Sequence, residues 1–282
     1  MSLPHLTHPG PAVGPRLTAV ACTAHPVTLR LPAGARVTQA VAEALQRAGF
    51  AAGYLRLDGV ALAALRYVIP APGPGDGRVA WYGETRQLNG ARVIAAGLHL
   101  GEAGGAPFCH CHGIWAEDAA PAVMGHLLCD ESVLARDAVV SGWGISGARL
   151  SRQDDPETGF ALFEPVAVAA APHEDGAPRG AARLCRIRPN ADLATELGRL
   201  RVGRAQVEGI GSLIGVAFEA APPVAGPAAE VLITRGALDA RSLSLEIAAV
   251  GMDGGLREGV PARGRNAVCI TAELLVLPAV AP

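Results

Sequence analysis

The sequence predicts an α+β fold of two similar domains, each a mainly antiparallel β-sheet packed with one or two helices. The apolar runs are short and are separated by Gly, Pro or Asn, which is typical of antiparallel strands. An amphipathic, helix-like segment occurs near the start of each half. Half of the 282 residues are apolar and only 18% are charged, so a substantial core can be buried.

The first half begins with a β-rich run that ends in a Pro-Ala-Gly turn. After this turn, Val37, Val41 and Leu45 recur at helical spacing and predict a helix. Apolar strands are then expected at residues 57–68, 92–100, 108–118 and 133–144. The Pro- and Gly-rich residues 70–77 between the first two predict an exposed loop.

The second half repeats this order. Asn190 and Asp192 are typical helix N-terminal residues, and a helix is expected directly after them. Strands are then expected at residues 210–219, 230–238, 243–254 and 267–277. The repeated order predicts a tandem duplication.

These features divide the chain into four segments. Residues 1–15 are expected to form a flexible, Pro-rich tail, and residues 16–166 a first domain. The small, turn-forming residues 167–181 predict a linker, and residues 182–282 a second domain.

Composition excludes several classes of function. The net charge is −2, so no broad attraction to nucleic acid or to an anionic membrane is expected. The chain contains no Lys, which excludes a lysine Schiff base and the usual P-loop. A GC-rich bacterial genome would explain the use of Arg instead. With no signal peptide, no apolar stretch of 18 residues and no C-x-x-C pair, we expect a cytoplasmic protein with reduced thiols.

The densest chemistry lies in the segment FCHCHGIW. Alternation along a strand places His110 and His112 on one face, and Cys109 and Cys111 on the other. His126 follows a turn-like segment and could return on the neighbouring strand. Three histidines with an open fourth position are typical of a zinc site, although Ni, Fe and Cu also accept imidazole ligands.

The residues around this cluster leave its chemistry open. Glu117 and Asp118 could supply a fourth ligand or a general base, but the sequence A-E-D-A-A-P favours a turn. The counterpart of the H-C-H segment in the second half is Glu246-Ile247-Ala248, which has no histidine. We therefore expect one site per chain, in the first domain, and a degenerate second domain without it.

The order of these motifs resembles the PPC domain, also called DUF296, of plants and prokaryotes. The matching segments are Leu31–Gly34, Leu57–Val60, His110–His112, Gly125–Leu128 and Ser151–Pro165. The resemblance covers residues 16–165 and, more faintly, residues 181–278. Met124 stands where the family has the first of two glycines before His-Leu.

The resemblance implies an α+β fold with a mainly antiparallel sheet and assembly into trimers. It also implies a three-histidine metal site, which falls here on His110, His112 and His126. It implies no particular molecular activity. A cupin is the competing interpretation of the H-x-H segment, but a second cupin motif does not follow, and two helices fit a jelly roll poorly.

Three functions follow from these observations. The first is a self-associating binding or regulatory module, with a possible small-molecule ligand. The second is a metal-dependent hydrolase or lyase, and the third, placed last because of charge, is DNA binding. The module is favoured because no nucleophile–base pair accompanies the histidines. A cleft beside the site, lined by Arg and acidic residues, would reverse that order.

Overall fold

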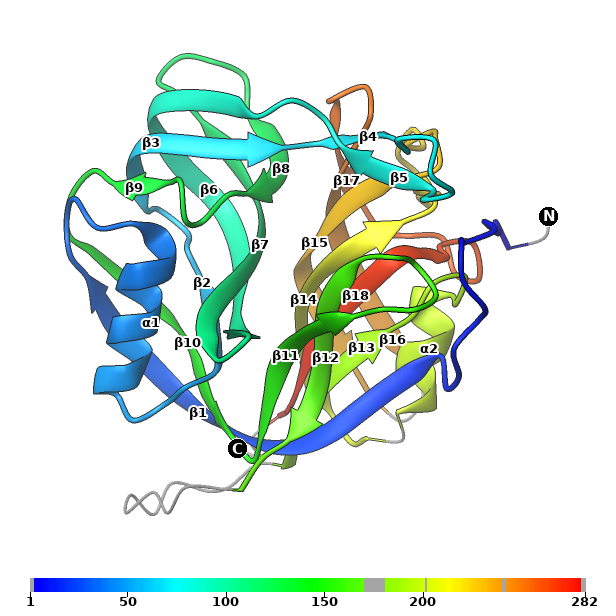
Figure 1. Ribbon diagram of the computed structural model, residues 1–282, viewed down its shortest axis with the longest axis horizontal. Coiled ribbons are helices and arrows are strands. Elements are labelled where there is room, and N and C mark those ends of the chain that lie inside the picture. The colour runs from blue at the N-terminus through cyan, green and yellow to red at the C-terminus, as the bar shows by residue number, and fades with distance from the viewer. Residues whose placement is uncertain (1–2, 170–180, 201, 240–241, 280–282) are drawn as a thin grey trace.

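The structure is a computed structural model that describes residues 3–169, 181–200, 202–239 and 242–279. Within these residues, it contains two helices among mainly antiparallel strands, as the sequence predicted (Figure 1). Neither of these helices has the length and apolar character needed to cross a membrane.

The first half contains one helix and twelve strands among its described residues. These elements are β1 (Leu17–Leu31), α1 (Val37–Arg47), β2 (Gly53–Arg56), β3 (Ala61–Val68), β4 (Pro70–Pro72), β5 (Ala80–Tyr82), β6 (Arg86–Ala103), β7 (Ala106–Ala116), β8 (Val123–Leu127), β9 (Val133–Leu134), β10 (Ala138–Ser146), β11 (Ala148–Asp154) and β12 (Ala161–Ala167).

The second half is shorter. Its elements are β13 (Ala181–Ile187), α2 (Leu193–Arg199), β14 (Ala205–Leu213), β15 (Ala229–Leu238), β16 (Leu243–Gly251), β17 (Leu256–Gly259) and β18 (Val268–Pro278).

The strands of both halves pair in the same order. The order is β1-β10-β2-β6-β7-β8 in the first half and β13-β18-β14-β15-β16-β17 in the second. Every pair in these two series is antiparallel, and β1 also pairs with β13, which joins the halves into one sheet. The two similar domains expected from the sequence are therefore present as two matching sets of strands.

The turn before each helix is also repeated. Gly34 has a φ of +76° and Asn190 a φ of +61°, in the left-handed region that glycine and asparagine tolerate best. Asp192 is the N-cap of α2, as the sequence predicted, and its carboxylate accepts the Thr195 N–H at 2.8 Å. The equivalent residue before α1, Arg36, makes no side-chain cap.

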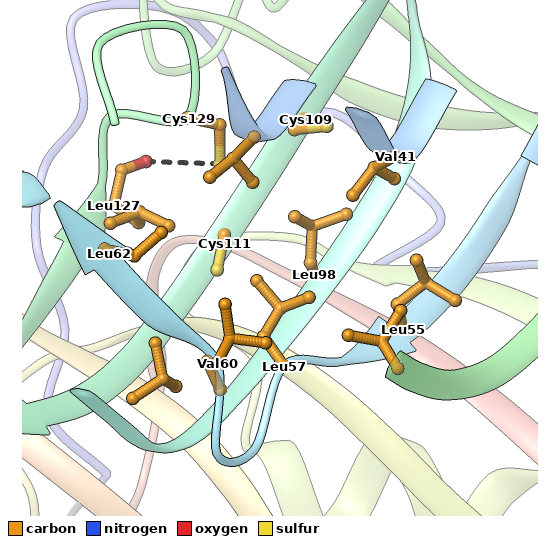
Figure 2. Close-up of a cluster of buried hydrophobic side chains, with 14 of the residues drawn as sticks. Val41, Leu55, Leu57, Val60, Leu62, Leu98, Cys109, Cys111, Leu127 and Cys129 are labelled. Carbon is orange, nitrogen blue, oxygen red and sulfur yellow. Dashed lines mark hydrogen bonds between the residues drawn. The ribbon is translucent and has the colours of Figure 1, made fainter. Parts of the chain in front are cut away.

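The main hydrophobic core lies between α1 and the first-half sheet. Cys109, Cys111 and Cys129 are buried there among leucines and valines, and Figure 2 shows Cys111 close to Leu98. All six cysteines are buried free thiols. The face of β7 opposite this core is the one that carries the histidines.

The histidine-bearing face of the first half is turned toward the second half. Strands β6 and β7 contact β14 and β15, with the two helices on the outer sides (Figure 1). Apolar residues from the second half, including Ile210 and Leu232, complete the core cluster that contains Cys111. Groups from either half can therefore meet between the strands of the two halves.

The described part of the expected N-terminal tail is hydrogen-bonded to the rest of the protein. The Leu6 N–H donates to Asn190 Oδ1 at 2.8 Å, and the Gly10 N–H donates to the Glu157 carbonyl at 2.9 Å. Residues 3–15 thus contact both halves. Most of the predicted linker, residues 170–180, lies outside the described residues.

Candidate metal site

The structure brings the three predicted histidines together. His110 and His112 lie on β7, and His126 lies on β8 directly opposite His112. Nε2 of His112 lies 3.1 Å from Nε2 of His110 and 3.3 Å from Nδ1 of His126. Metal–nitrogen bonds of 2.0–2.1 Å in a tetrahedral site place two nitrogens about 3.3 Å apart. The spacing of the imidazole nitrogens therefore fits a metal ion of this class.

The position of His126 depends on the glycine before it. A Cβ on Gly125 would lie 2.5 Å from the carbonyl oxygen of Val68, which is closer than atoms can approach. Glycine at this position lets β8 lie against β3, and Met124 and Gly125 are both part of the strand. The other edge of β8 pairs with β7, and this pairing places His126 opposite His112.

The second half orients two of the imidazoles. The Nδ1–H of His112 donates to the Val231 carbonyl at 3.0 Å. Since a carbonyl can only accept, this bond leaves a lone pair on Nε2 of His112. Nδ1 of His110 lies 3.2 Å from a carboxylate oxygen of Glu273, an arrangement that likewise directs Nε2 of His110 toward the cluster.

A second carboxylate lies beside the converging nitrogens. Oε2 of Glu230 is 3.0 Å from Nε2 of His112, the same atom that faces the other two histidines. The Tyr82 hydroxyl lies 3.0 Å from Nδ1 of His126. Glu230 is therefore placed to be a fourth ligand or a proton acceptor.

Burial sets the charge state of the site. It lowers the pKa of His112 to about 3, and it lowers the pKa of His126 well below its usual value. Burial also raises the pKa of Glu230 to about 7. Burial favours the neutral forms of His110 and Glu273 too, but their mutual attraction outweighs it, raising the pKa of His110 and lowering that of Glu273. Neutral His112 and His126 have the form that a metal requires.

The structure does not bring Glu117 and Asp118 to the histidines. They lie in the turn after β7, where the Ala120 N–H donates to the Glu117 carbonyl at 3.1 Å. The Glu117 carboxylate accepts the Asn89 N–H at 2.7 Å. This is the turn that the sequence favoured.

A cavity of about 300 Å³ opens beside His110 and His126. One wall comes from the hairpin β4–β5, which carries Trp81 and Tyr82. A second wall comes from the hairpin β11–β12 and the turn between its strands, and Glu230 and Glu273 line the cavity at the histidines. The Pro- and Gly-rich loop expected at residues 70–77 thus belongs to a hairpin at the site.

Sequence reasoning missed the contribution of the second half. That half lacks a site histidine, as predicted, but Glu230, Glu273 and the Val231 carbonyl all contact the cluster. The sequence placed the three histidines in the first domain and identified no residue of the second half beside them. A signal was present, because both glutamates stand inside apolar strands, where an unpaired carboxylate is costly.

No protein-family model matches the sequence, and no curated protein matches it either. Among solved structures, a PPC protein from Pyrococcus horikoshii is 16% identical, with a TM-score of 0.39, over 52% of this chain and 96% of the other. A metal-containing protein from Archaeoglobus fulgidus is 22% identical, with a TM-score of 0.39, over 50% and 94%. A candidate DNA-binding protein from Ralstonia eutropha JMP134 is 15% identical, with a TM-score of 0.39, over 49% and 89%.

Proposed function

We propose that the protein binds one divalent transition metal per chain through His110, His112 and His126, with Zn²⁺ as the first choice, and acts on a small molecule in the adjoining cavity. The observation that carries this proposal is the convergence of three imidazole nitrogens at the edge of a cavity. The cavity is also lined by Arg152 and two glutamates. Such a cleft favours a hydrolase or lyase over a passive binding module.

The residues of the site divide the work of such a reaction. A metal held by the histidines supplies Lewis-acid chemistry to an oxygen of the small molecule or of water. Glu230, whose pKa burial raises to about 7, can accept or return a proton near neutral pH. Glu273 and the Val231 carbonyl keep two imidazoles in their orientations, and the two hairpins limit the access of water.

A binding or regulatory module is the second candidate, and the position of Glu230 is the observation that favours it. Because Oε2 of Glu230 lies 3.0 Å from Nε2 of His112, this carboxylate could itself complete a four-ligand, closed site. Loading the protein with Co²⁺ and adding azide separates the two. A change of the visible spectrum on azide addition indicates a free position, as an enzyme needs. No change with azide, together with an altered spectrum in Glu230→Gln, favours the module.

Metal content tests the proposal that both candidates share. Tag-free protein is expected to contain close to one equivalent of metal per chain, and the His110→Ala/His112→Ala variant is expected to contain almost none. His5→Ala, at an exposed histidine outside the site, is the matched control. A folded wild-type protein that takes up no metal after Zn²⁺ is added would overturn the proposal.

Self-association is part of the proposal as well. The PPC resemblance favours a homo-oligomer, with a trimer as the expected state, and light scattering coupled to size exclusion measures it. DNA binding ranks last because the net charge is −2 and the chain has no Lys. A salt-dependent mobility shift on duplex DNA would reverse that ranking.

A further inference from the structure

The aromatic side chains of this protein are concentrated around the cavity. The whole chain has 5 Phe, 3 Trp and 3 Tyr residues. Five of these line the one cavity beside the histidines, namely Trp81, Tyr82, Phe108, Phe160 and Phe163. Because the cores are built mainly from aliphatic residues, this concentration indicates a surface suited to a flat apolar ligand.

The aromatic residues form two walls that face the same space. Trp81 of β5 stacks on Phe160, with the ring centroids 5.5 Å apart and an interplanar angle of 26°. Phe108 of β7 meets Phe163 of β12 edge to face, at 5.6 Å and 79°. Trp81 is 41% exposed, so the stacked pair stands where the cavity meets solvent.

One arginine and two glutamates line the cavity. Arg152 is exposed and lines the cavity, with its guanidinium carbon 5.1 Å from the centre of the Phe108 ring. It forms no ion pair with a carboxylate of the described residues, whereas Arg78, near the same mouth, is paired with Asp76. Glu230 and Glu273 line the same cavity, and each lies against a histidine.

These groups determine how a ligand lies. An anionic group is attracted to the guanidinium of Arg152, which lines the cavity and forms no ion pair with a carboxylate of the described residues. A neutral hydroxyl or amide suits the part of the cavity beside Glu230 and Glu273, where carboxylates can accept its hydrogen bonds. The volume of about 300 Å³ is at the lower end for small-molecule sites, and it suits a single ring with short substituents.

We propose that this cavity binds a small aromatic carboxylate, with its ring between the aromatic walls, its carboxylate at Arg152 and a neutral polar substituent beside Glu230 and Glu273. The proposal deepens the proposed function, since it names the class of small molecule that reaches the metal site. It also rests on features that do not require the metal, namely the aromatic walls and the position of Arg152.

Calorimetric titration of the full chain with matched probes tests this proposal. The probes are 4-hydroxyphenylacetate, its neutral amide, and cyclohexylacetate, each added to metal-loaded and to metal-free protein. We expect the aromatic acid to bind about tenfold more tightly than the amide, because a charge-assisted pair with Arg152 is lost in the amide. We expect cyclohexylacetate to bind more weakly than the aromatic acid, because its ring cannot stack.

Substitution of Arg152 tests whether its guanidinium binds the carboxylate of the ligand. Arg152→Gln is expected to weaken binding of the aromatic acid about tenfold and to leave binding of the amide unchanged. Arg47→Gln, at an exposed arginine on α1, is the matched control and should change neither. Equal affinity of the wild-type protein for acid and amide, an unchanged affinity in Arg152→Gln, or no binding of any probe at millimolar concentration would overturn the proposal.

Together with the metal content, these titrations distinguish failure of the ligand proposal from failure of the proposed metal-dependent function. Protein that takes up metal but binds no aromatic acid contradicts only the ligand class. Protein that binds the acid but takes up no metal contradicts only the proposed metal-dependent function.

Discussion

The two halves of the molecule have the same strand order but contribute different chemistry to one site. The first half supplies imidazoles from β7 and β8, and the second supplies Glu230 from β15 and Glu273 from β18. The first half also carries the hairpins β4–β5 and β11–β12, which have no counterpart among the described residues of the second. A repeated scaffold has thus provided two unlike faces, and the candidate site needs both.

The largest loss of stability is expected where buried ion pairs join the two halves. Asp155, at the end of β11–β12, binds Arg186 of β13 at 2.7 Å and Arg188 at 3.0 Å, and the Asp155 and Arg186 side chains are almost fully buried. Asp155→Ala leaves Arg186 and Arg188 with one shared carboxylate partner, Glu164, so one buried charge is no longer balanced. We therefore expect the free energy of unfolding to fall by about 3–5 kcal/mol. Urea denaturation measures this loss. Asp154→Ala, at the exposed neighbour, should change stability by less than about 0.5 kcal/mol, and equal midpoints for both variants would contradict the expectation.

The pH dependence of stability tests how tightly the halves enclose a buried histidine. His99 of β6 lies 3.1 Å from the Glu273 carbonyl of β18, and burial lowers the pKa of His99 from 6.5 to about 4. Between these values the unfolded chain binds the proton more tightly, so stability falls as the pH drops from 6.5 toward 4. We expect His99 to contribute a loss of about 3 kcal/mol across this window.

Urea denaturation of the wild-type protein and of His99→Gln at pH 7 and pH 4 measures this contribution. The variant should lose less stability on acidification than the wild-type protein does. Glu230, whose pKa is raised to about 7, has the opposite effect on stability, but it is present in both proteins and cancels in the difference. Parallel pH profiles would show that His99 does not titrate as expected.

Metal affinity tests the contribution of the second half to the site. The Glu273 carboxylate lies 3.2 Å from Nδ1 of His110, and it is not one of the three candidate metal ligands. Loss of such an orienting carboxylate typically lowers metal affinity 10- to 100-fold, and we expect Glu273→Gln to weaken Zn²⁺ binding by about that factor. Competition with a chromophoric chelator measures the change. Glu258→Gln, at an exposed glutamate on β17, is the control. Equal Zn²⁺ affinities in the two variants would show that Glu273 does not contribute to metal binding.

The smallest change in stability is expected at the N-termini of the two helices. Asp192 caps α2 by accepting the Thr195 N–H, whereas Arg36 at the equivalent place before α1 makes no side-chain cap. Asp192→Ala is expected to lower stability by about 1 kcal/mol, and Arg36→Ala by less than half of that amount. Thermal unfolding of the two variants compares them directly, and similar losses would mean that the caps do not distinguish the halves.

Local patterns in the sequence were sufficient for several features of the fold and site. The period of two along β7 places His110 and His112 on the face opposite Cys109 and Cys111, because successive side chains of a strand alternate. The N-cap of α2 was also predictable, since a cap depends only on the residues next to the helix.

The sequence alone therefore predicted the fold class, the repeat and the three histidines, because each of them follows from local patterns of residues. Only the tertiary structure decided that Glu230 and Glu273, more than 100 residues from His126, lie against them. It likewise decided that the turn residues Glu117 and Asp118 do not. The physical reason is that periodicity specifies which face of a strand a side chain occupies, whereas the order and packing of the strands specify what that face meets.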